Sequence, residues 1–331
     1  MFPNALNVGD EIRIIAPSRS LAIISSSVRS LAISRLEKLG LKVTFSKNAE
    51  EKDQFDSSSI QSRIDDIHQA FADPCVKGIL TTIGGSNSIQ LLQQLDYELI
   101  KKNPKIFCGY SDITTLQNAI FAKTGLITYS GPHFSTFGCL KGIEYVIDNF
   151  HEMFFKQTKE VDLLSSNLWS DDEWYLNQEE RTFFPNNGFQ IIANGEARGT
   201  IIGGNIESFR LLQGTSFMPQ LKDAILFMED NYPMTLDDLD RHLHSLMLLD
   251  DFQKVRGLVL GRFQVASKID NGLLKTLFLS KKMLQGLPII ANADFGHTLP
   301  IFTFPIGGNV RLFSQESQVR LTIEPMYNCT V

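Results

Sequence analysis

Three side chains that together could hydrolyse an amide bond each follow a predicted strand: Ser111, Glu229 and His297. A serine hydroxyl becomes a nucleophile when an imidazole takes its proton, and the imidazole in turn needs an orienting carboxylate. The order serine, acid, histidine along the chain is the one seen in α/β serine hydrolases. These residues are therefore the candidates for nucleophilic chemistry, provided that the fold brings the ends of their strands together.

Ser111 stands where a strand is predicted to turn sharply into a helix. The apolar run 105–108 suits a buried strand, and Gly109 permits a tight turn. The following helix would end at Gly125. A serine here could project from the sheet edge as at a nucleophile elbow, although the G-x-S-x-G pattern is absent. The alternative is a serine that only caps the helix, since serine is a favoured cap residue.

Glu229 and the histidines each have a second interpretation. A carboxylate at the end of the apolar run 225–228 needs a partner, which could be an arginine such as Arg241 or Arg262. His242 and His244 are two residues apart, and on a helix they would point to different faces, whereas helical metal pairs are spaced i, i+4. No metal site is therefore predicted.

The turn Gly84-Gly85-Ser86-Asn87 directly follows a predicted strand at 76–83. Neither the Walker pattern nor G-x-G-x-x-G is present, so a phosphate loop of those kinds is not predicted. The turn could supply backbone N–H donors to a ligand, or it could simply connect a strand to a helix.

Composition limits the class of protein. A chain of 331 residues with 43% hydrophobic residues is long enough for two domains with substantial cores. A net charge of −6 argues against nucleic acid as a partner. No signal peptide or membrane-spanning run is visible, so no membrane contact is expected. The four cysteines form no C-x-x-C pair, which fits a reducing cytoplasm; they are Cys75, Cys108, Cys139 and Cys329.

The first half of the chain alternates predicted strands and helices. Strands are expected at 10–16, 42–45, 76–83 and 105–108, with helices at 28–39, 57–71 and 88–95 between them. Such alternation indicates a parallel sheet covered by helices on both faces. Working groups in these sheets collect beyond the carboxyl ends of the strands, which is where Gly84-Gly85 and Ser111 lie.

The second half is predicted to be a smaller mixed α/β domain. Segments 189–193 and 197–202 suggest a hairpin around Asn194-Gly195, and 310–313 with 319–323 suggest a closing antiparallel pair. Thr235 and Asp238 have the spacing of a capping box. The polar segment 166–187, which holds Trp169 and Trp174, is expected to link the two domains.

At these residues the chain resembles the LD-carboxypeptidase family of serine peptidases, and more closely its microcin C immunity branch. The matching motifs occur in the expected order over nearly the whole chain; they are Gly84-Gly85, Gly109-Tyr110-Ser111-Asp112-Ile113-Thr114, Gly131-Pro132-His133, Gly203-Gly204-Asn205, 225–230 and 294–298.

The resemblance implies a fold and a mechanism. The fold would be α/β, with a flavodoxin-like parallel-sheet domain at 1–165 and a smaller α/β domain of β-barrel character at 188–331. The resemblance also implies a Ser111–His297–Glu229 triad and a homodimer. No cofactor is expected. Oxyanion donors would come from the backbone N–H groups of Asp112 and Gly85.

The segment 169–174 looks like the loop with which the immunity branch stacks an aromatic ring on a nucleobase. It favours a peptidyl or aminoacyl nucleotide as substrate, with Trp169 or Trp174 as the stacking residue. Ser86, Asn87 and Asn205 are further candidates for substrate binding. A muropeptide with an L,D bond is the alternative substrate. A small-molecule binding protein without catalytic activity is the alternative of another class.

Overall fold

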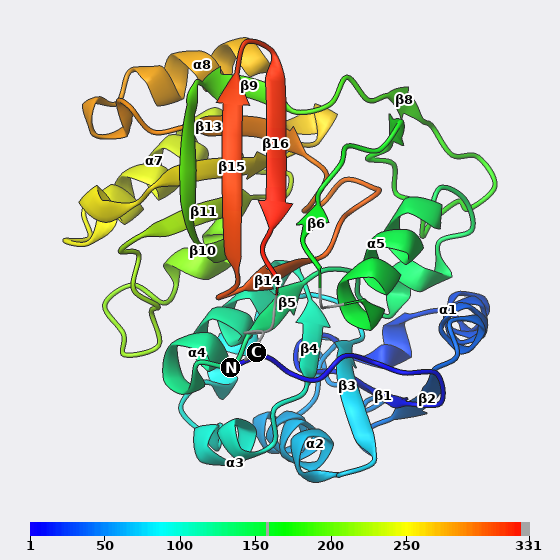
Figure 1. Ribbon diagram of the computed structural model, residues 1–331. Helices are drawn as coiled ribbons and strands as arrows, with labels where there is room; N and C mark the ends of the chain where they lie inside the picture. The colour runs from blue at the N-terminus through cyan, green and yellow to red at the C-terminus, as the bar shows by residue number, and fades with distance from the viewer. Residues whose placement is uncertain (157–158, 326–331) are drawn as a thin grey trace.

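The chain folds into two bodies, each built on a sheet (Figure 1). The structure is a computed structural model that describes residues 1–156 and 159–325; Cys329 lies outside them. The fold is mixed α/β with a parallel sheet in the N-terminal part, as the sequence predicts.

The N-terminal sheet has the strand order β14-β5-β4-β3-β1-β2. Its first five strands in sequence are parallel in the flavodoxin-like order 2-1-3-4-5, so the carboxyl ends of β3 and β4 lie side by side. The strands are β1 (Glu11–Ile15), β2 (Lys42–Phe45), β3 (Val76–Thr81), β4 (Ile106–Gly109), β5 (Thr128–Ser130) and β14 (Phe304–Ile306).

Helices flank this sheet, and their sequences explain where they begin and end. Ser25 and Ser59 accept N-terminal N–H groups of α1 and α2, and Gly125 ends α4 in a left-handed conformation. The helices are α1 (Ser26–Lys38), α2 (Ile60–Ala72), α3 (Tyr97–Lys102), α4 (Thr114–Thr124) and α5 (Glu144–Phe155). The helix expected at 88–95 is only a 3₁₀ turn, η2 (Ser88–Leu91), because its first residues are hydrogen-bonded to Asp112.

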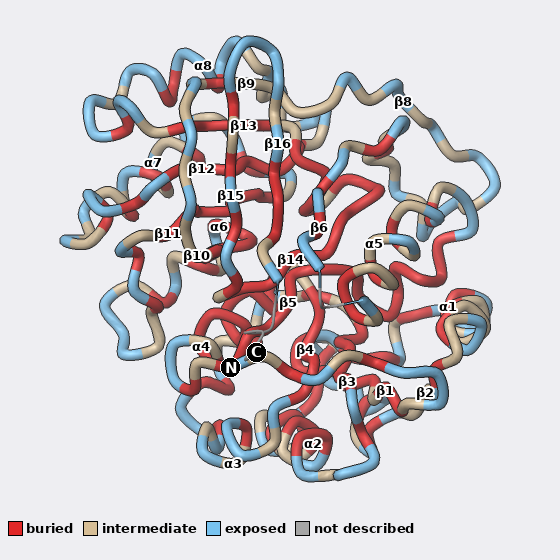
Figure 2. The backbone as a smooth tube through the Cα atoms, in the orientation of Figure 1, coloured by how far each residue is buried: buried red, intermediate tan, exposed pale blue. Residues whose placement is uncertain are grey.

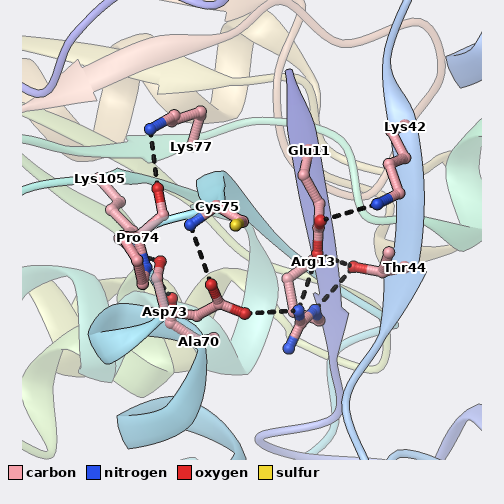
Figure 3. Close-up of polar contacts among 10 residues, drawn as sticks. All are labelled: Glu11, Arg13, Lys42, Thr44, Ala70, Asp73, Pro74, Cys75, Lys77 and Lys105. Carbon is pink, nitrogen blue, oxygen red and sulfur yellow. Dashed lines mark hydrogen bonds and ion pairs between the residues drawn. The ribbon is translucent and has the colours of Figure 1, made fainter. Parts of the chain in front are cut away.

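The amino ends of β1 and β2 carry a charged network (Figure 3). Glu11 accepts hydrogen bonds from Arg13 and Thr44, both at 2.7 Å, and Arg13 also reaches Asp73 at 3.1 Å. Burial alone would raise the pKa of Glu11, but the donated hydrogen bonds and the charge of Arg13 lower it overall. Lys105 donates to carbonyl oxygens at the end of α2. Every charge here has a partner, which indicates a structural role for this edge of the sheet.

The C-terminal sheet has eight strands in the order β6-β16-β15-β10-β11-β12-β13-β9. Its central strands β10 to β13 are parallel, and antiparallel strands flank them. The strands are β6 (Val161–Asp162), β9 (Gln190–Ala193), β10 (Gly195–Asn205), β11 (Ala224–Glu229), β12 (Gly257–Gly261), β13 (Ile289–Ala293), β15 (Asn309–Gln315) and β16 (Gln318–Ile323).

Two predicted pairings of this sheet have different outcomes. The antiparallel pair β15–β16 is confirmed. The predicted hairpin around Asn194-Gly195 is wrong, since β9 pairs with β13 while β10 pairs with β11 and β15. The chain reverses there, but β9 bends away to the far edge. The Ser314 hydroxyl of β15 donates to the Ala193 carbonyl at 3.1 Å, so the end of this edge strand lies close to β15.

The C-terminal helices pack beside the strands β10 to β13 (Figure 1). They are α6 (Ile206–Arg210), α7 (Leu236–Met247) and α8 (Asn271–Leu279). The predicted capping box is present: Thr235 accepts from the N–H of Asp238, and the Asp238 carboxylate accepts from the N–H of Thr235. The remaining short helices are the 3₁₀ turns η1 (Leu21–Ile23), η3 (Ser111–Ile113), η4 (Ser135–Gly138), η5 (Phe252–Lys254), η6 (Val265–Ser267) and η7 (Lys282–Leu284).

Each sheet contains one strand from the part of the sequence that mainly forms the other body. β14 lies between β13 and β15 in sequence but pairs with β5, while β6 precedes the linker and pairs with β16. The linker forms its own two-stranded sheet of β7 (Leu168–Trp169) and β8 (Phe184–Pro185). Figure 2 shows buried chain running through the middle strands of both sheets, with exposed chain on the outer helices and loops. Over residues 1–156 and 159–325, no helix has the length and apolar character needed to cross a membrane.

Candidate active site

The structure brings the three candidate side chains into one hydrogen-bonded chain. Ser111 Oγ lies 3.0 Å from His297 Nε2, and His297 Nδ1 lies 2.7 Å from Glu229 Oε2. Because a carboxylate can only accept, Nδ1 carries the proton, and Nε2 is left to accept from the Ser111 hydroxyl. The arrangement can therefore remove a proton from the serine.

Ser111 lies on a sharp strand-to-helix turn between β4 and α4. Its φ of 61° is in the left-handed region, which residues with a side chain seldom occupy. Its hydroxyl does not cap the helix, since neither η3 nor α4 has a side-chain cap. The strained backbone aims the hydroxyl away from the helix and toward His297, as at a nucleophile elbow.

The helix after Ser111 fixes its position relative to the other body. Asn118 of α4 donates to the Gly203 carbonyl at 2.8 Å, and the Asn205 N–H donates to the Thr114 hydroxyl at 3.0 Å. In the sheet register, Asn205 lies opposite Glu229 of the neighbouring strand. These buried contacts join the serine-bearing elbow to the strand that carries the acid.

Glu229 occupies a tight buried position at the end of β11. It is 3% exposed, and a Cβ on Gly296, whose φ is 101°, would lie 2.4 Å from its carboxylate. Only glycine suits this conformation and this space. The arginines considered as alternative partners bond elsewhere: Arg262 with Asp294 and Arg241 with Asp238. The carboxylate is therefore committed to the imidazole.

The pKa of His297 is raised above its ordinary value. Burial alone would lower the pKa, but the Glu229 charge, its hydrogen bond and the charge of Asp230 together outweigh that effect. Asp230 points to the other side of β11, where Asn205 donates to it at 3.1 Å and His242 lies 3.6 Å away. The site therefore favours the protonated form of this imidazole.

The Gly84–Gly85 turn lies against the elbow. A Cβ on Gly84 would come within 3.0 Å of Ser111 Oγ, and a Cβ on Gly85, whose φ is 159°, would collide with Ser18 Oγ at 2.2 Å. The Asp112 carboxylate accepts from the N–H groups of Asn87 and Ser88 at 3.0 and 2.9 Å. The side chain of Asp112 thus holds the turn beside the nucleophile, which leaves its own backbone N–H and that of Gly85 as candidate oxyanion donors.

Two aromatic residues that sequence reasoning did not assign to the site line its floor. The Tyr110 ring lies 4.3 Å from the His133 ring and 5.5 Å from the His297 ring, measured between centroids. Burial raises the pKa of Tyr110 to about 12, and burial together with the His297 charge lowers that of His133 to about 3. Both rings are uncharged at neutral pH. Both residues lie in motifs that match the family, 109–114 and 131–133, and this was the feature of the sequence that could have pointed to them.

A cleft of about 470 Å³ opens over Ser111 and His297. Its walls come from both bodies and the linker, including Arg19, Gly85, Thr136, Trp174, Tyr232 and Gln264. A substrate would thus contact segments that are far apart in the sequence.

The predicted substrate-binding residues fall in different places. Trp174 lines the cleft, whereas Trp169 packs between Phe184, at 5.0 Å, and the Arg262 guanidinium, at 4.8 Å. Ser86, Asn87 and Asn205 are not among the lining residues. Asn205 is buried and caps α6.

The part of the chain that the structure describes contains no group of three or more His, Cys, Asp or Glu that could hold a metal ion. His242 and His244 do not come together as a pair. His242 faces Asp230, whereas His244 bonds Asp240 on its own helix.

A serine, a histidine and an acid that meet beyond the carboxyl ends of strands are typical of a serine hydrolase, and similarity to known proteins gives the family. The profile of the LD-carboxypeptidase N-terminal domain matches residues 12–131, and that of the C-terminal domain matches residues 198–312. The chain belongs to the LD-carboxypeptidase family, and it is a serine carboxypeptidase-like hydrolase.

Similar proteins span the whole chain. "Putative carboxypeptidase YocD" of Bacillus subtilis is 49% identical over 98% of this chain and 99% of its own length. The crystal structure of an MccF-like protein from Bacillus anthracis, 53% identical, superposes with a TM-score of 0.97 over 98% of this chain and 99% of that one.

The microcin C7 self-immunity protein MccF of Escherichia coli is 30% identical over 96% of this chain and 94% of its own length. Its structure in complex with aspartyl sulfamoyl adenosine has a TM-score of 0.89 over 99% of both chains. These likenesses confirm the family and the immunity branch named from the motifs.

Proposed function

We propose that this chain hydrolyses an amide bond of a peptidyl or aminoacyl nucleotide with Ser111 as nucleophile, His297 as general base and acid, and Glu229 as the orienting carboxylate. The observation that carries the proposal is the continuous hydrogen-bonded chain from Ser111 Oγ through His297 to Glu229. A non-catalytic binding protein would have no need of a strained serine aimed at a buried imidazole–carboxylate pair.

The reaction follows from the geometry in two halves. Ser111 Oγ attacks the amide carbon while its proton passes to His297 Nε2. The C–N bond then breaks, and His297 returns the proton to the leaving nitrogen. Water next attacks the acyl-serine ester, gives its proton to the same imidazole, and releases the carboxylic acid with Ser111 restored. Glu229 keeps the imidazole in one tautomer throughout and stabilises its charged form.

The negative oxygen of the tetrahedral intermediate would be held by the backbone N–H groups of Gly85 and Asp112. Each aligned donor contributes on the order of 3 kcal/mol to the transition state. The Asp112 carboxylate supports this role indirectly, since it binds the turn that contains Gly85. No step in this sequence calls for a metal ion, so activity is expected to persist in a chelator.

Trp174 supports a nucleotide over a muropeptide. It is the tryptophan that lines the cleft, and an aromatic ring there could stack on a nucleobase. Support also comes from MccF, which is similar over the whole chain and whose structure was solved with aspartyl sulfamoyl adenosine. A muropeptide has no base to stack.

The nucleophile is tested with a fluorophosphonate probe and by substitution. Ser111→Ala should lose labelling and hydrolysis while keeping the fold, whereas Ser135→Ala, a control serine in the same cleft, should keep both. Hydrolysis by Ser111→Ala above a few per cent of the wild-type rate would remove Ser111 from the nucleophile role.

The substrate class is tested by offering aspartyl and glutamyl sulfamoyl adenosine beside a tetrapeptide muropeptide, with products identified by mass spectrometry. Trp174→Ala should weaken binding of the adenosine compounds by about five- to a hundredfold, the value of one stacked base. Trp169→Ala is the matched control and should leave that binding unchanged. If the protein cleaves only the muropeptide, the proposal of a nucleotide substrate is wrong and LD-carboxypeptidase activity replaces it.

A further inference from the structure

We propose that Arg19 binds an anionic group of the substrate next to the scissile amide. The inference rests on the proposed function, since it concerns the same cleft. The shared chemistry is an oxyanion beyond the leaving nitrogen: the terminal carboxylate of a peptide, or the phosphoryl or sulfamoyl group of an aminoacyl nucleotide.

Arg19 lies beside the turn that faces the nucleophile. The backbone N–H of Arg19 donates to the Gly84 carbonyl at 3.3 Å, and a Cβ on Gly85 would lie 3.0 Å from the Cγ of Arg19. The other side of this turn approaches Ser111, since a Cβ on Gly84 would lie 3.0 Å from Ser111 Oγ. The arginine and the serine therefore flank one short turn, and both line the cleft.

Arg19 is the only lysine or arginine among the described residues that line this cleft, and its side chain is exposed. No carboxylate in residues 1–156 and 159–325 forms an ion pair with it, whereas most of the other arginines there have one. Its charge is therefore available to a ligand.

The acidic side chains of the cleft are engaged elsewhere. Asp172 is bound by Arg181 at 2.7 Å, Asp171 accepts from the Val265 N–H at 2.6 Å, and Glu173 accepts from the Tyr175 hydroxyl. All three lie on the linker wall, while Arg19 comes from the loop after β1. The cleft therefore offers one free cation on the side of the oxyanion turn.

A guanidinium suits this task because its planar fork binds carboxylate and phosphoryl oxygens through two parallel hydrogen bonds. A carboxypeptidase must also tell a terminal residue from an internal one, and the free carboxylate is the difference. A cation beside the reacting carbonyl would supply that discrimination and draw the amide toward Ser111.

Binding to the Ser111→Ala protein separates this inference from the proposed function, because it needs no turnover. Calorimetry would compare two matched ligand pairs. The first pair is the tetrapeptide muropeptide and its C-terminal amide. The second is aspartyl sulfamoyl adenosine and the corresponding 5′-aspartylamino-5′-deoxyadenosine, which lacks the acidic sulfamoyl group.

The charged member of at least one pair should bind about tenfold more tightly than the neutral member. This expected preference lies between the contribution of an exposed ion pair and that of a charge-assisted hydrogen bond. Adding Arg19→Gln should remove that preference, and Arg19→Lys should retain part of it. Arg320→Gln, at an exposed arginine of β16, is the matched control and should keep the full preference. The pair that responds identifies the source of the anion.

Equal weakening of charged and neutral ligands by Arg19→Gln would overturn the inference, as would the absence of any preference in the Arg19 protein or of any binding. The proposed function fails by a different result: the ligands bind with the Arg19-dependent preference, but the wild-type protein cleaves none of them.

Discussion

At the scale of single residues, the site is organised around the charge of one imidazole. His297 is held by Glu229 through a 2.7 Å hydrogen bond, and the charge of Asp230 on the opposite side of β11 acts in the same direction. A raised pKa makes His297 a stronger base, but it also means that the imidazole is protonated and inactive over a wider acidic range.

The acidic limb of the pH profile should report this pKa. Because the unprotonated imidazole is the base, kcat/KM should fall as pH drops through the raised value, which lies above the ordinary pKa of about 6.5. Asp230→Asn removes one of the charges that raise the pKa, so it should move this limb to lower pH. A limb below pH 6 in the wild-type protein would contradict the assignment.

Protonation of His297, which should lower activity, should stabilise the fold. A histidine whose pKa is higher in the folded state stabilises the fold fully below its unfolded pKa, and this contribution is lost as pH rises through the folded pKa. Urea midpoints measured with and without His297→Gln should therefore differ most on the acidic side of that window. A difference that instead grows with rising pH would show that the folded pKa is lowered.

Glu229→Gln tests the charge of the acid while keeping its shape. An amide can still accept a hydrogen bond, but it cannot stabilise an imidazolium by charge. We expect turnover to fall by about 10⁴-fold at neutral pH, as acid-to-amide changes do in other triads. Ligand affinity should change little. Near-normal steady-state turnover would make Glu229 a structural carboxylate.

At the scale of elements, the proposed catalysis depends on how two turns are held together. The turn after β3 carries Gly85, and the elbow after β4 carries Ser111; the Asp112 carboxylate joins them through the N–H groups of Asn87 and Ser88 and the hydroxyl of Ser18 at 2.6 Å. Parallel strands place these turns side by side, and the carboxylate sets the spacing between them together with the Ser88 hydroxyl, which donates to the Asp112 carbonyl at 2.7 Å.

Asp112→Asn should therefore loosen the oxyanion side without touching the hydrogen bond between Ser111 and His297. All three donors bond the same carboxylate oxygen, Oδ2, so an amide oxygen in its place can keep the contacts but loses the negative charge that strengthens them. We expect kcat to fall by about 10- to 1,000-fold, where the upper limit is the effect of losing one oxyanion donor completely. Labelling by a fluorophosphonate should also become slower. Asp65→Asn, at a half-buried position of α2 whose carboxylate bonds only Gln61 among the contacts of this helix, is a suitable control. A variant that retains wild-type kcat would show that the turn holds its place without this carboxylate.

At the scale of the whole molecule, the residues to which we assign catalysis come from different sheets, so the proposed site exists only when both bodies are docked. Phe304 of β14 lies between them: it pairs with β5 of one sheet, and its ring lies 4.7 Å from Phe227 of the other. Phe295 lies 5.1 Å from Phe304 and is two residues before His297. The apolar contact between the bodies is thus continuous with the site.

Phe304→Ala should lower the free energy of unfolding by about 3–5 kcal/mol, the usual cost of removing a fully buried phenylalanine. Phe304→Leu should cost less, since it leaves a smaller cavity. Thermal unfolding followed by both circular dichroism and loss of activity should show the two signals falling together. Activity that disappears well before the structure unfolds would mean that the bodies separate first.

Much of this fold could be predicted from local patterns. The alternation of strands and helices, the capping box at Thr235, and the turn at Ser111 are each decided by residues close together in the sequence. The structure confirms the α/β fold class, because apolar periodicity and cap residues act over a few turns of chain. The three chemical side chains were also recognisable, since each directly follows an apolar strand.

Long-range pairing decided the rest. The hairpin predicted at Asn194-Gly195 failed because β9 pairs with β13, about a hundred residues further along the chain, while β10 pairs with β11 and β15 instead of β9. For the same reason the sequence could not say that Trp174 faces the cleft while Trp169 packs under Arg262, or that Asn205 is buried. The sequence by itself determined which residues could do the chemistry. Only the tertiary structure decided which of them meet, because a side chain's neighbours are set by the packing of distant strands rather than by its place in a motif.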